Sequence, residues 1–225
     1  MVRLVELTPE GRIVVALVEG SRSYGELKSL TGLSDRWLSK KLKELSSAGI
    51  IERYGRRYRL KNPEHIIGSD PAFAMFLSDR ISLRSKAKLM AGELGRDERI
   101  LAVILFGSLA RNEASEESDI DLLVVTEEDM EEELNRKAYD LMFKYDVPVD
   151  VICLTLEDLI INLNEETAFA FSILESYEVL FDRDGVETLL SIRRKKLMRD
   201  WIYDGEAGAW IKKKLKYTLK QPKAK

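Results

Sequence analysis

Leu105-Phe106-Gly107-Ser108 ends an apolar run that begins at Ile100, and Asp119-Ile120-Asp121 opens a second apolar run that ends at Val125. Both runs have the length and the β-branched content of buried strands. Residues two apart on a strand point to the same face, so Asp119 and Asp121 should project together, close to the Gly107-Ser108 turn. Glycine lets backbone amides approach phosphate oxygens, and a helix beginning there would offer free N–H groups. The stretch therefore predicts a divalent cation held beside a phosphate.

A third carboxylate comes later in the chain. Residues 147–154 predict another strand, with Asp150 near its start. If that strand lies beside the one carrying Asp119 and Asp121, the three acids converge, as a two-metal phosphoryl or nucleotidyl transfer site requires. Asp119 and Asp121 would bind metal, and Asp150 would share one ion and help to deprotonate the attacking group. Each motif alone also has an ordinary structural explanation as an exposed turn or a solvated strand edge.

In this order and spacing, the motifs resemble the DNA polymerase β-type nucleotidyltransferase superfamily, and within it the minimal nucleotidyltransferase (MNT) proteins of archaea and bacteria. The resemblance covers roughly Ile100 to Leu154. It implies a mixed sheet flanked by helices, Mg²⁺ or Mn²⁺ as the metal, and a nucleoside triphosphate, with ATP the expected one, as substrate. The residues that it assigns to nucleotide binding are Gly107, Ser108, Arg111 and Ser118, and those that it assigns to catalysis and metal binding are Asp119, Asp121 and Asp150.

The chain departs from the family pattern at two places in the loop after the Gly-Ser turn. Many relatives have a second Arg and a Gly there, where this chain has Leu109 and Asn112. Arg111, by contrast, matches a basic position often found just after the turn. The departures leave the geometry of the phosphate loop and the choice of substrate open.

Charge is strongly segregated along the chain, although the net charge is only −3. Residues 1–62 carry 13 Lys or Arg against 7 Asp or Glu, whereas residues 63–191 carry 11 against 29 and residues 192–225 carry 12 against 3. A basic N-terminal part suits a polyanionic partner. The acidic middle argues against DNA or RNA as the acceptor in a transferase reaction.

The N-terminal part predicts three helices, at residues 8–18, 23–30 and 35–48, followed by short strands at 50–54 and 57–60. This order resembles the winged helix-turn-helix of small prokaryotic transcription regulators, whose third helix enters the major groove. We expect that helix to bury Trp37. The candidate DNA contacts are Arg36, Lys40 and Lys41 on the third helix and Arg56 and Arg57 on the wing. A winged helix used for protein docking or dimerisation is the alternative.

These patterns predict an α/β (α+β) chain of four parts. They are a winged helix-turn-helix DNA-binding domain at 1–62, connecting helices at 63–98, a nucleotidyltransferase domain at 99–183 and a C-terminal helical basic segment at 184–225. Within the third part, residues 127–146 predict one helix with an acidic first turn. From Gly185 to about Lys220 the pattern is again helical, with breaks expected at Gly205 and Gly208.

Two functions follow as hypotheses. In the first, the chain is a Mg²⁺-dependent nucleotidyltransferase that moves a nucleoside monophosphate from a nucleoside triphosphate to an acceptor by a two-metal mechanism, and it also binds DNA. The acceptor is open: a protein hydroxyl, a small molecule or an RNA end. Some MNT relatives are antitoxins that adenylylate a toxin, so the resemblance implies a toxin-like protein partner. In the second, the chain is a transcription regulator, or an antitoxin-like protein, that senses nucleotide without turnover.

Other features of the sequence limit the chemistry and the cellular location that we expect. A single cysteine, Cys153, excludes an intrachain disulfide, and a single histidine, His65, excludes catalysis by paired histidines within one chain. No apolar stretch reaches transmembrane length and no signal-peptide pattern begins the chain, so we expect a cytoplasmic protein without a membrane partner. Because winged-helix proteins usually read two-fold sites, a homodimer is also expected.

Overall fold

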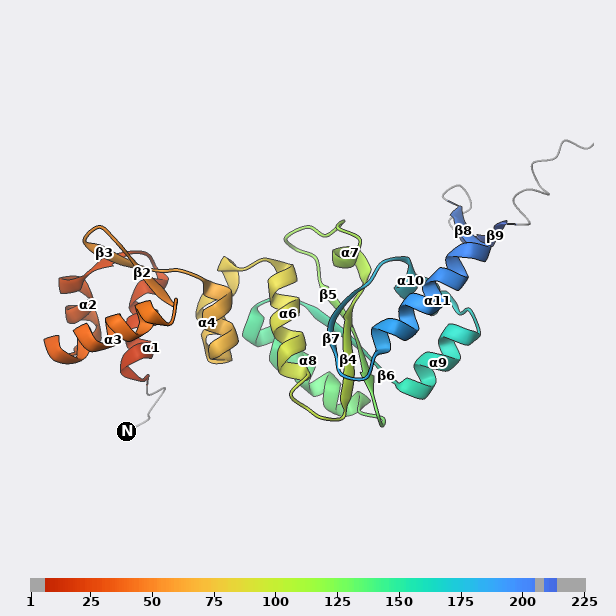
Figure 1. The fold of residues 1–225 in the computed structure, drawn as a ribbon, viewed down its shortest axis with the longest axis horizontal. Coiled ribbons are helices and arrows are strands. Elements are labelled where there is room, and N and C mark those ends of the chain that lie inside the picture. The colour runs from red at the N-terminus through yellow and green to blue at the C-terminus, as the bar shows by residue number, and fades with distance from the viewer. Residues whose placement is uncertain (1–6, 205–208, 214–225) are drawn as a thin grey trace, which may run out of the picture. The chain divides into compact units, whose positions relative to one another are not determined.

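The computed structural model describes residues 7–204 and 209–213, and these fall into two compact units. One unit holds the chain up to Leu89 together with Phe143–Asp146, and the other holds Met90–Met142 together with the chain from Val147. Both units contain helices together with strands, so the predicted α/β (α+β) class is confirmed (Figure 1). None of the helices in the described ranges combines the length and hydrophobicity needed to cross a bilayer.

The first unit begins with a winged helix-turn-helix. Its elements are α1 (Pro9–Val18), β1 (Arg22–Ser23), α2 (Tyr24–Thr31), α3 (Asp35–Ser47), β2 (Ile51–Tyr54) and β3 (Arg57–Leu60). The helices begin where the sequence predicts, because the side chains of Thr8, Ser23 and Ser34 each accept a hydrogen bond from a backbone N–H in the first turn. The predicted hairpin gains a third strand, β1, which pairs antiparallel with β3.

The expected burial of Trp37 is wrong. The buried face of α3 consists of Leu38, Leu42 and Leu45, which follow one another at helical spacing, and the Trp37 side chain is 50% exposed. Trp37 precedes this stripe by one position and therefore points about 100° away from Leu38 around the helix. The ammonium of Lys40 lies 5.6 Å from its ring centroid, so the exposed face of α3 carries both an aromatic ring and cations.

The segment that follows the wing, where connecting helices are predicted, is helical in short pieces. It comprises α4 (Pro63–Ser69), the 3₁₀ turns η1 (Pro71–Phe73) and η2 (Ser78–Arg80), α5 (Ala74–Leu77) and α6 (Leu83–Leu94). The interruptions fall at Pro71 and at Ser82-Leu83. Ser82 accepts a hydrogen bond from the Ser85 N–H at 3.2 Å and so begins α6.

The second unit is built on a four-stranded mixed sheet in the order β6-β5-β4-β7. Its strands are β4 (Ile100–Leu105), β5 (Ile120–Thr126), β6 (Val149–Thr155) and β7 (Glu178–Asp182). β4 is antiparallel to both β5 and β7, whereas β5 and β6 are parallel. All six residues of β4 are buried, as expected for a strand that lies inside the sheet.

Helices cover both faces of this sheet. The helices of this unit are α7 (Gly107–Ala110), α8 (Glu131–Tyr145), α9 (Leu156–Asn164), α10 (Ala168–Glu175) and α11 (Val186–Asp200). Ile104, Leu123 and Val125 belong to one buried cluster with side chains of α9, α10 and α11. Figure 1 shows α8 on the opposite face. α8 begins at Glu131 and not at Glu127, because Asp129 accepts a hydrogen bond from the Glu131 N–H at 3.0 Å and starts the helix there.

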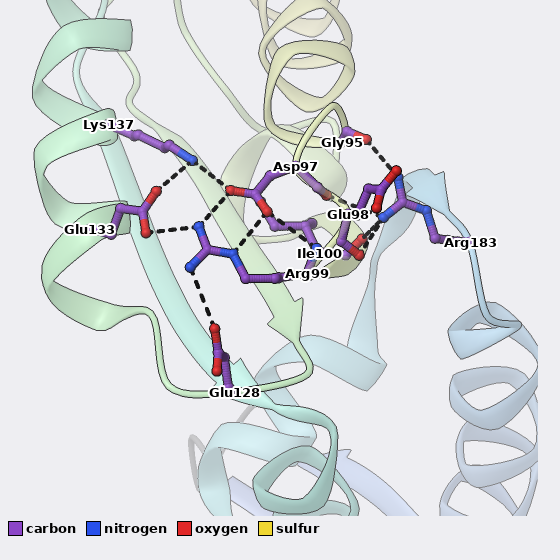
Figure 2. A network of polar contacts seen from close by, with 9 residues as sticks. All are labelled: Gly95, Asp97, Glu98, Arg99, Ile100, Glu128, Glu133, Lys137 and Arg183. Carbon is purple, nitrogen blue, oxygen red and sulfur yellow. Dashed lines mark hydrogen bonds and ion pairs between the residues drawn. The ribbon is translucent and has the colours of Figure 1, made fainter.

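A polar network ties α8 to the start of β4 (Figure 2). The Asp97 carboxylate accepts hydrogen bonds from Arg99 at 2.8 Å and from Lys137 of α8 at 3.1 Å. Arg99 in turn pairs with Glu133 at 2.9 Å and with Glu128 at 3.4 Å. The hydrogen bond from Arg99, followed by that from Lys137, holds the pKa of Asp97 well below its usual range. Asp97 is therefore ionised and fixes the entry of the chain into the sheet.

Arg183 closes the same corner from the end of β7. Its guanidinium donates to the backbone carbonyls of Gly95, Glu98 and Ile100 at 3.0, 2.6 and 3.1 Å, as Figure 2 shows. The ring of Phe181 lies so close to Gly95 that a β-carbon there would come within 2.7 Å of it. The turn before β4 is thus held in place by side chains from β7 and α8.

The predicted helix from Gly185 to about Lys220 is wrong beyond Asp200. The chain instead forms a hairpin of β8 (Trp201–Asp204) and β9 (Ala209–Lys212), while residues 205–208 and 214–220 lie outside the described residues. Trp201 and Trp210 pack on Phe171 of α10, and their ring centroids lie 5.0 and 5.2 Å, respectively, from that of Phe171. Aromatic and β-branched residues favour strands, and this cluster outweighs the helical spacing of the apolar residues.

Candidate active site

The Gly107-Ser108 turn lies directly against the acids of the second strand. Gly107 begins the short helix α7 with φ +69°, a left-handed conformation that favours glycine. The Phe106 N–H donates to the Asp121 backbone carbonyl at 3.1 Å, which fixes the turn beside β5. The Ser108 N–H donates to the Asp121 carboxylate. An anion at this turn is therefore met by a backbone donor, and in this structure that anion is Asp121 itself.

The three predicted acids converge. Asp121 and Asp150 are opposite each other in the parallel pairing of β5 and β6, so their side chains share one face of the sheet. Asp119 immediately precedes β5. One carboxylate oxygen of each of the three lies within 4.8 Å of the others. Burial raises the pKa of Asp121, and the nearby charges of Asp119 and then Asp150 raise it further. This repulsion is what a bound cation would relieve.

The residues fit a hard cation and a phosphate. Three carboxylates supply the oxygen ligands that Mg²⁺ prefers. The hydroxyl of Ser108 is buried and has no hydrogen-bond partner within the described part of the chain, which is unusual for a buried polar atom. A phosphate oxygen at the Gly107-Ser108 turn would satisfy it. The carboxylate oxygens and the unsatisfied hydroxyl thus lie close together at the Gly107-Ser108 turn.

The other predicted nucleotide-binding residues lie in the loop between α7 and β5. Arg111 ends α7 and pairs with Glu113 at 2.7 Å, and this hydrogen bond raises the pKa of Arg111. The Ser118 hydroxyl accepts a hydrogen bond from the Ser115 N–H at 2.9 Å and so stabilises the loop. Asn112 has φ +59°, a conformation that asparagine adopts more readily than most residues. The loop therefore keeps a left-handed backbone at the position where relatives often have glycine.

A cleft of about 740 Å³ opens beside Asp121 and Asp150. Its walls come from the end of β4, from β5, from one face of α8 and from the start of β6; the lining residues are Phe106, Asp121, Asn135, Ala138, Tyr139, Met142, Pro148, Val149, Asp150, Val151 and Ile152. The α8 residues were not identified from the sequence as part of the site. Their spacing, at 135, 138, 139 and 142, places them on one helix face and is the signal that could have identified them.

The predicted DNA contacts lie in the winged helix, and their surroundings differ. Arg36, Lys40 and Arg56 are exposed. Lys41 pairs with Glu10 at 2.5 Å and with Glu44 at 2.8 Å, and these hydrogen bonds raise its pKa. Arg57 donates to the Ser21 carbonyl at 2.7 Å and pairs with Glu26 at 3.2 Å. Lys41 and Arg57 thus have internal partners.

Comparison with known families identifies the family of this chain. Residues 73–185, half of the chain, match the model of the polymerase beta nucleotidyltransferase family. The chain belongs to that family. Residues 8–67 match the HxlR-like helix-turn-helix. The nucleotidyltransferase domain and the N-terminal helix-turn-helix, both predicted from the sequence, are therefore confirmed.

Two curated relatives of this chain come from Methanocaldococcus jannaschii. The putative protein adenylyltransferase MJ1305 is 31% identical over 92 residues, which cover 38% of this chain and 61% of the relative. The putative protein adenylyltransferase MJ0604 is 36% identical over 83 residues, which cover 37% of this chain and 80% of the relative. The chain thus spans 61% of the length of the first relative.

Known structures include one that overlaps half of this chain. It is the crystal structure of a toxin-antitoxin with AMP-PNP, which is 17% identical in sequence, with a TM-score of 0.38, and which covers 50% of this chain and 86% of the other.

Proposed function

We propose that this chain transfers a nucleoside monophosphate, with ATP as the donor, to a hydroxyl group of a protein. The observation that carries the proposal is the convergence of Asp119, Asp121 and Asp150 beside the Gly107-Ser108 turn. The family match supports the reaction class, and the two archaeal relatives named as putative protein adenylyltransferases support the kind of acceptor.

In this proposal each residue has a defined role. The Gly107-Ser108 turn binds the triphosphate through its backbone N–H and the unsatisfied Ser108 hydroxyl, and Arg111 and Ser118 line the nucleotide side. Asp119, Asp121 and Asp150 hold Mg²⁺ or Mn²⁺, which supplies charge stabilisation at the reacting phosphate in a two-metal arrangement. Asp150 also receives the proton of the attacking hydroxyl. Positioning and electrostatics supply most of the rate enhancement, as is general for phosphoryl transfer.

The test is incubation of the purified chain with Mg²⁺, α-labelled ATP and cell extract, with pyrophosphate release and protein labelling measured together. The double variant Asp119→Ala/Asp121→Ala should lose both signals while its circular dichroism is unchanged. The matched control is Glu116→Ala/Glu117→Ala, which removes two exposed acids from the loop just before β5. Turnover that survives the first variant would reject the proposal. Nucleotide binding without turnover in the unmodified chain would favour a nucleotide-sensing regulator.

We also propose that the winged helix binds DNA. The support is the match to the HxlR-like helix-turn-helix together with the excess of Lys and Arg in residues 1–62. Arg36 and Lys40 are exposed on α3, and Arg56 is exposed at the tip of the wing, where phosphate contacts would form. Lys41 and Arg57 would exchange their internal partners for phosphates. Binding as a homodimer to a two-fold site fits this role.

A further inference from the structure

β6 has an unpaired outer edge within the described part of the chain. It is the terminal strand of the sheet order, and among the described strands it pairs only with β5. The Ile120 N–H donates to the Pro148 carbonyl at 3.0 Å. Because backbone groups alternate in direction along a strand, those of Asp150 also face β5, and those of Val149 and Val151 face outward. The outer edge thus presents donors and acceptors at the spacing that another strand would match.

The cleft runs along this edge. Four consecutive β6 residues, Val149 to Ile152, line it, and consecutive side chains point to opposite faces of a sheet. The cleft is therefore open to the edge of the strand and not only to one face. On the α8 side its wall consists of Asn135, Ala138, Tyr139 and Met142, and Tyr139 is 64% exposed.

The two ends of the site lie on opposite sides of β5. The Gly107-Ser108 turn follows β4, which pairs with one edge of β5, whereas Asp150 is on β6, which pairs with the other edge. In a displacement at phosphorus, the attacking and leaving oxygens are roughly in line. With the triphosphate at the Gly-Ser turn, the attacking hydroxyl must approach from the β6 side, which is where the cleft opens.

We propose that the acceptor is an extended peptide segment that pairs with the outer edge of β6 and so places a Ser, Thr or Tyr hydroxyl beside Asp150. This inference rests on the proposed function and specifies its acceptor. The hydroxyl oxygen forms a bond to the α-phosphorus of ATP, the bond from that phosphorus to the bridging oxygen breaks, and pyrophosphate leaves with the electron pair. The hydroxyl proton passes to the Asp150 carboxylate.

Pairing at this edge fixes which residues flank the modified one. A peptide residue opposite Asp150 has its side chain on the face that carries Asp121, within about 5 Å of Asp150 between β-carbons. Its two neighbours point to the other face, toward Val149 and Val151 and the α8 wall at Tyr139. We therefore expect apolar residues on both sides of the modified residue.

The chemistry of the edge favours a peptide over the other acceptors. Backbone N–H and C=O groups at strand spacing are what a polypeptide offers and what an RNA end or a small metabolite lacks. The surroundings are also acidic, since residues 63–191 hold 29 Asp or Glu against 11 Lys or Arg. An RNA backbone would be repelled by this charge.

The experiment uses the full chain with Mg²⁺, ATP and a library of nonapeptides that carry Ser, Thr or Tyr at the centre and random residues elsewhere. Mass spectrometry identifies the modified peptides. The best substrate is then remade with a single N-methyl group at each position in turn, which removes one backbone donor at a time. Strand pairing predicts that sensitive and tolerant positions alternate along the peptide, with at least a tenfold loss of rate at the sensitive ones. The phase of the alternation gives the direction of pairing.

The outcomes separate this inference from the proposed function. Modified peptides with alternating sensitivity and apolar neighbours support it. Modified peptides whose rate is insensitive to N-methylation, or sensitive at consecutive positions, overturn it. Turnover that depends on Asp119 and Asp121 and labels protein in extract, but no peptide in the library, also overturns it and leaves the proposed function intact. Absence of any turnover rejects both.

Discussion

A β-carbon built on Gly107 would lie 1.8 Å from the Oδ2 atom of Asp121. No pair of unbonded heavy atoms tolerates that distance, so the closeness of the turn to the carboxylate requires glycine at this position. The backbone of Gly107 is also left-handed, with φ +69°. Two independent constraints, steric and conformational, therefore act on one residue at the centre of the candidate site.

Gly107→Ala tests this relationship. The new methyl group would force Asp121 or the turn to move, so we expect nucleotide turnover to fall at least tenfold. Gly185→Ala is the matched control, because Gly185 has φ +76° but, apart from its chain neighbours, no described residue has an atom within 4 Å of the added carbon. In the control, only the strain of a left-handed alanine should lower the free energy of unfolding, by about 1 kcal/mol. In Gly107→Ala, overpacking should lower the free energy of unfolding by about 1–3 kcal/mol more. Urea unfolding measures both, and equal losses would contradict the close contact.

The acids at positions 119, 121 and 150 should make stability depend on Mg²⁺. Burial and the neighbouring carboxylates raise the pKa of Asp121, so the ionised form costs the fold free energy when no cation is present. In EDTA we expect Asp121→Asn to melt at a higher temperature than the unmodified chain. Mg²⁺ at about a hundred times its dissociation constant should stabilise the unmodified chain by about 2.7 kcal/mol and the variant much less.

The control for this prediction is Glu116→Gln, which removes a charge from the same loop at an exposed position. Its melting temperature should respond to Mg²⁺ as the unmodified chain does. An unmodified chain whose melting temperature is the same in EDTA and in Mg²⁺ would count against a metal site at these acids.

The geometry at the centre of the candidate site could be predicted from the sequence because it depends on local patterns. The spacing of Asp119 and Asp121 on one strand, and the apolar run that ends at Gly107, fix the faces and ends of two strands without knowledge of the rest of the fold. Asp150 needed one further assumption, that its strand lies beside β5. The pairing of Asp121 with Asp150 confirms it.

Features that depend on tertiary packing could not be predicted in the same way. The apolar residues between 185 and 220 have helical spacing, so the hairpin of β8 and β9 was not predicted. Its aromatic rings pack on Phe171, which belongs to a helix distant in sequence. Trp37 was predicted to be buried, but the buried stripe of α3 consists of leucines and Trp37 lies outside it. In the first case a residue far away in sequence decides the structure. In the second, the packing of the helix decides which of its faces is buried.

The Asp97 network should make unfolding depend on pH in the acid range. Arg99 and Lys137 hold the pKa of Asp97 well below its usual range, so the ionised carboxylate stabilises the fold above about pH 4 and loses this effect as the pH falls further. Asp97→Asn should therefore be less stable by roughly 1 kcal/mol at pH 7, with the difference shrinking below about pH 4. Urea unfolding at several pH values measures it.

Glu128→Gln is the control for the Asp97 variant. Glu128 belongs to the same network, but its side chain is 63% exposed and its pairing with Arg99, at 3.4 Å, is long. Exposed pairs contribute little, so the stability of this variant should stay close to that of the unmodified chain at every pH. A difference for Asp97→Asn that is the same at pH 7 and pH 3 would show that the lost stability comes from packing and not from the charge.

Two cationic side chains of α3 can be compared to test which of them contacts DNA. Arg36 is exposed on α3, whereas Lys41 is held by Glu10 and Glu44. Each phosphate contact changes the slope of log affinity against log salt by about 0.9. Arg36→Ala should reduce that slope by about 1, and Lys41→Ala should reduce it less, because its ammonium must first leave two carboxylates. Fluorescence anisotropy with a random-sequence duplex at several salt concentrations measures the slopes. If Arg36→Ala leaves the slope unchanged, α3 does not face the DNA and the winged helix serves another partner.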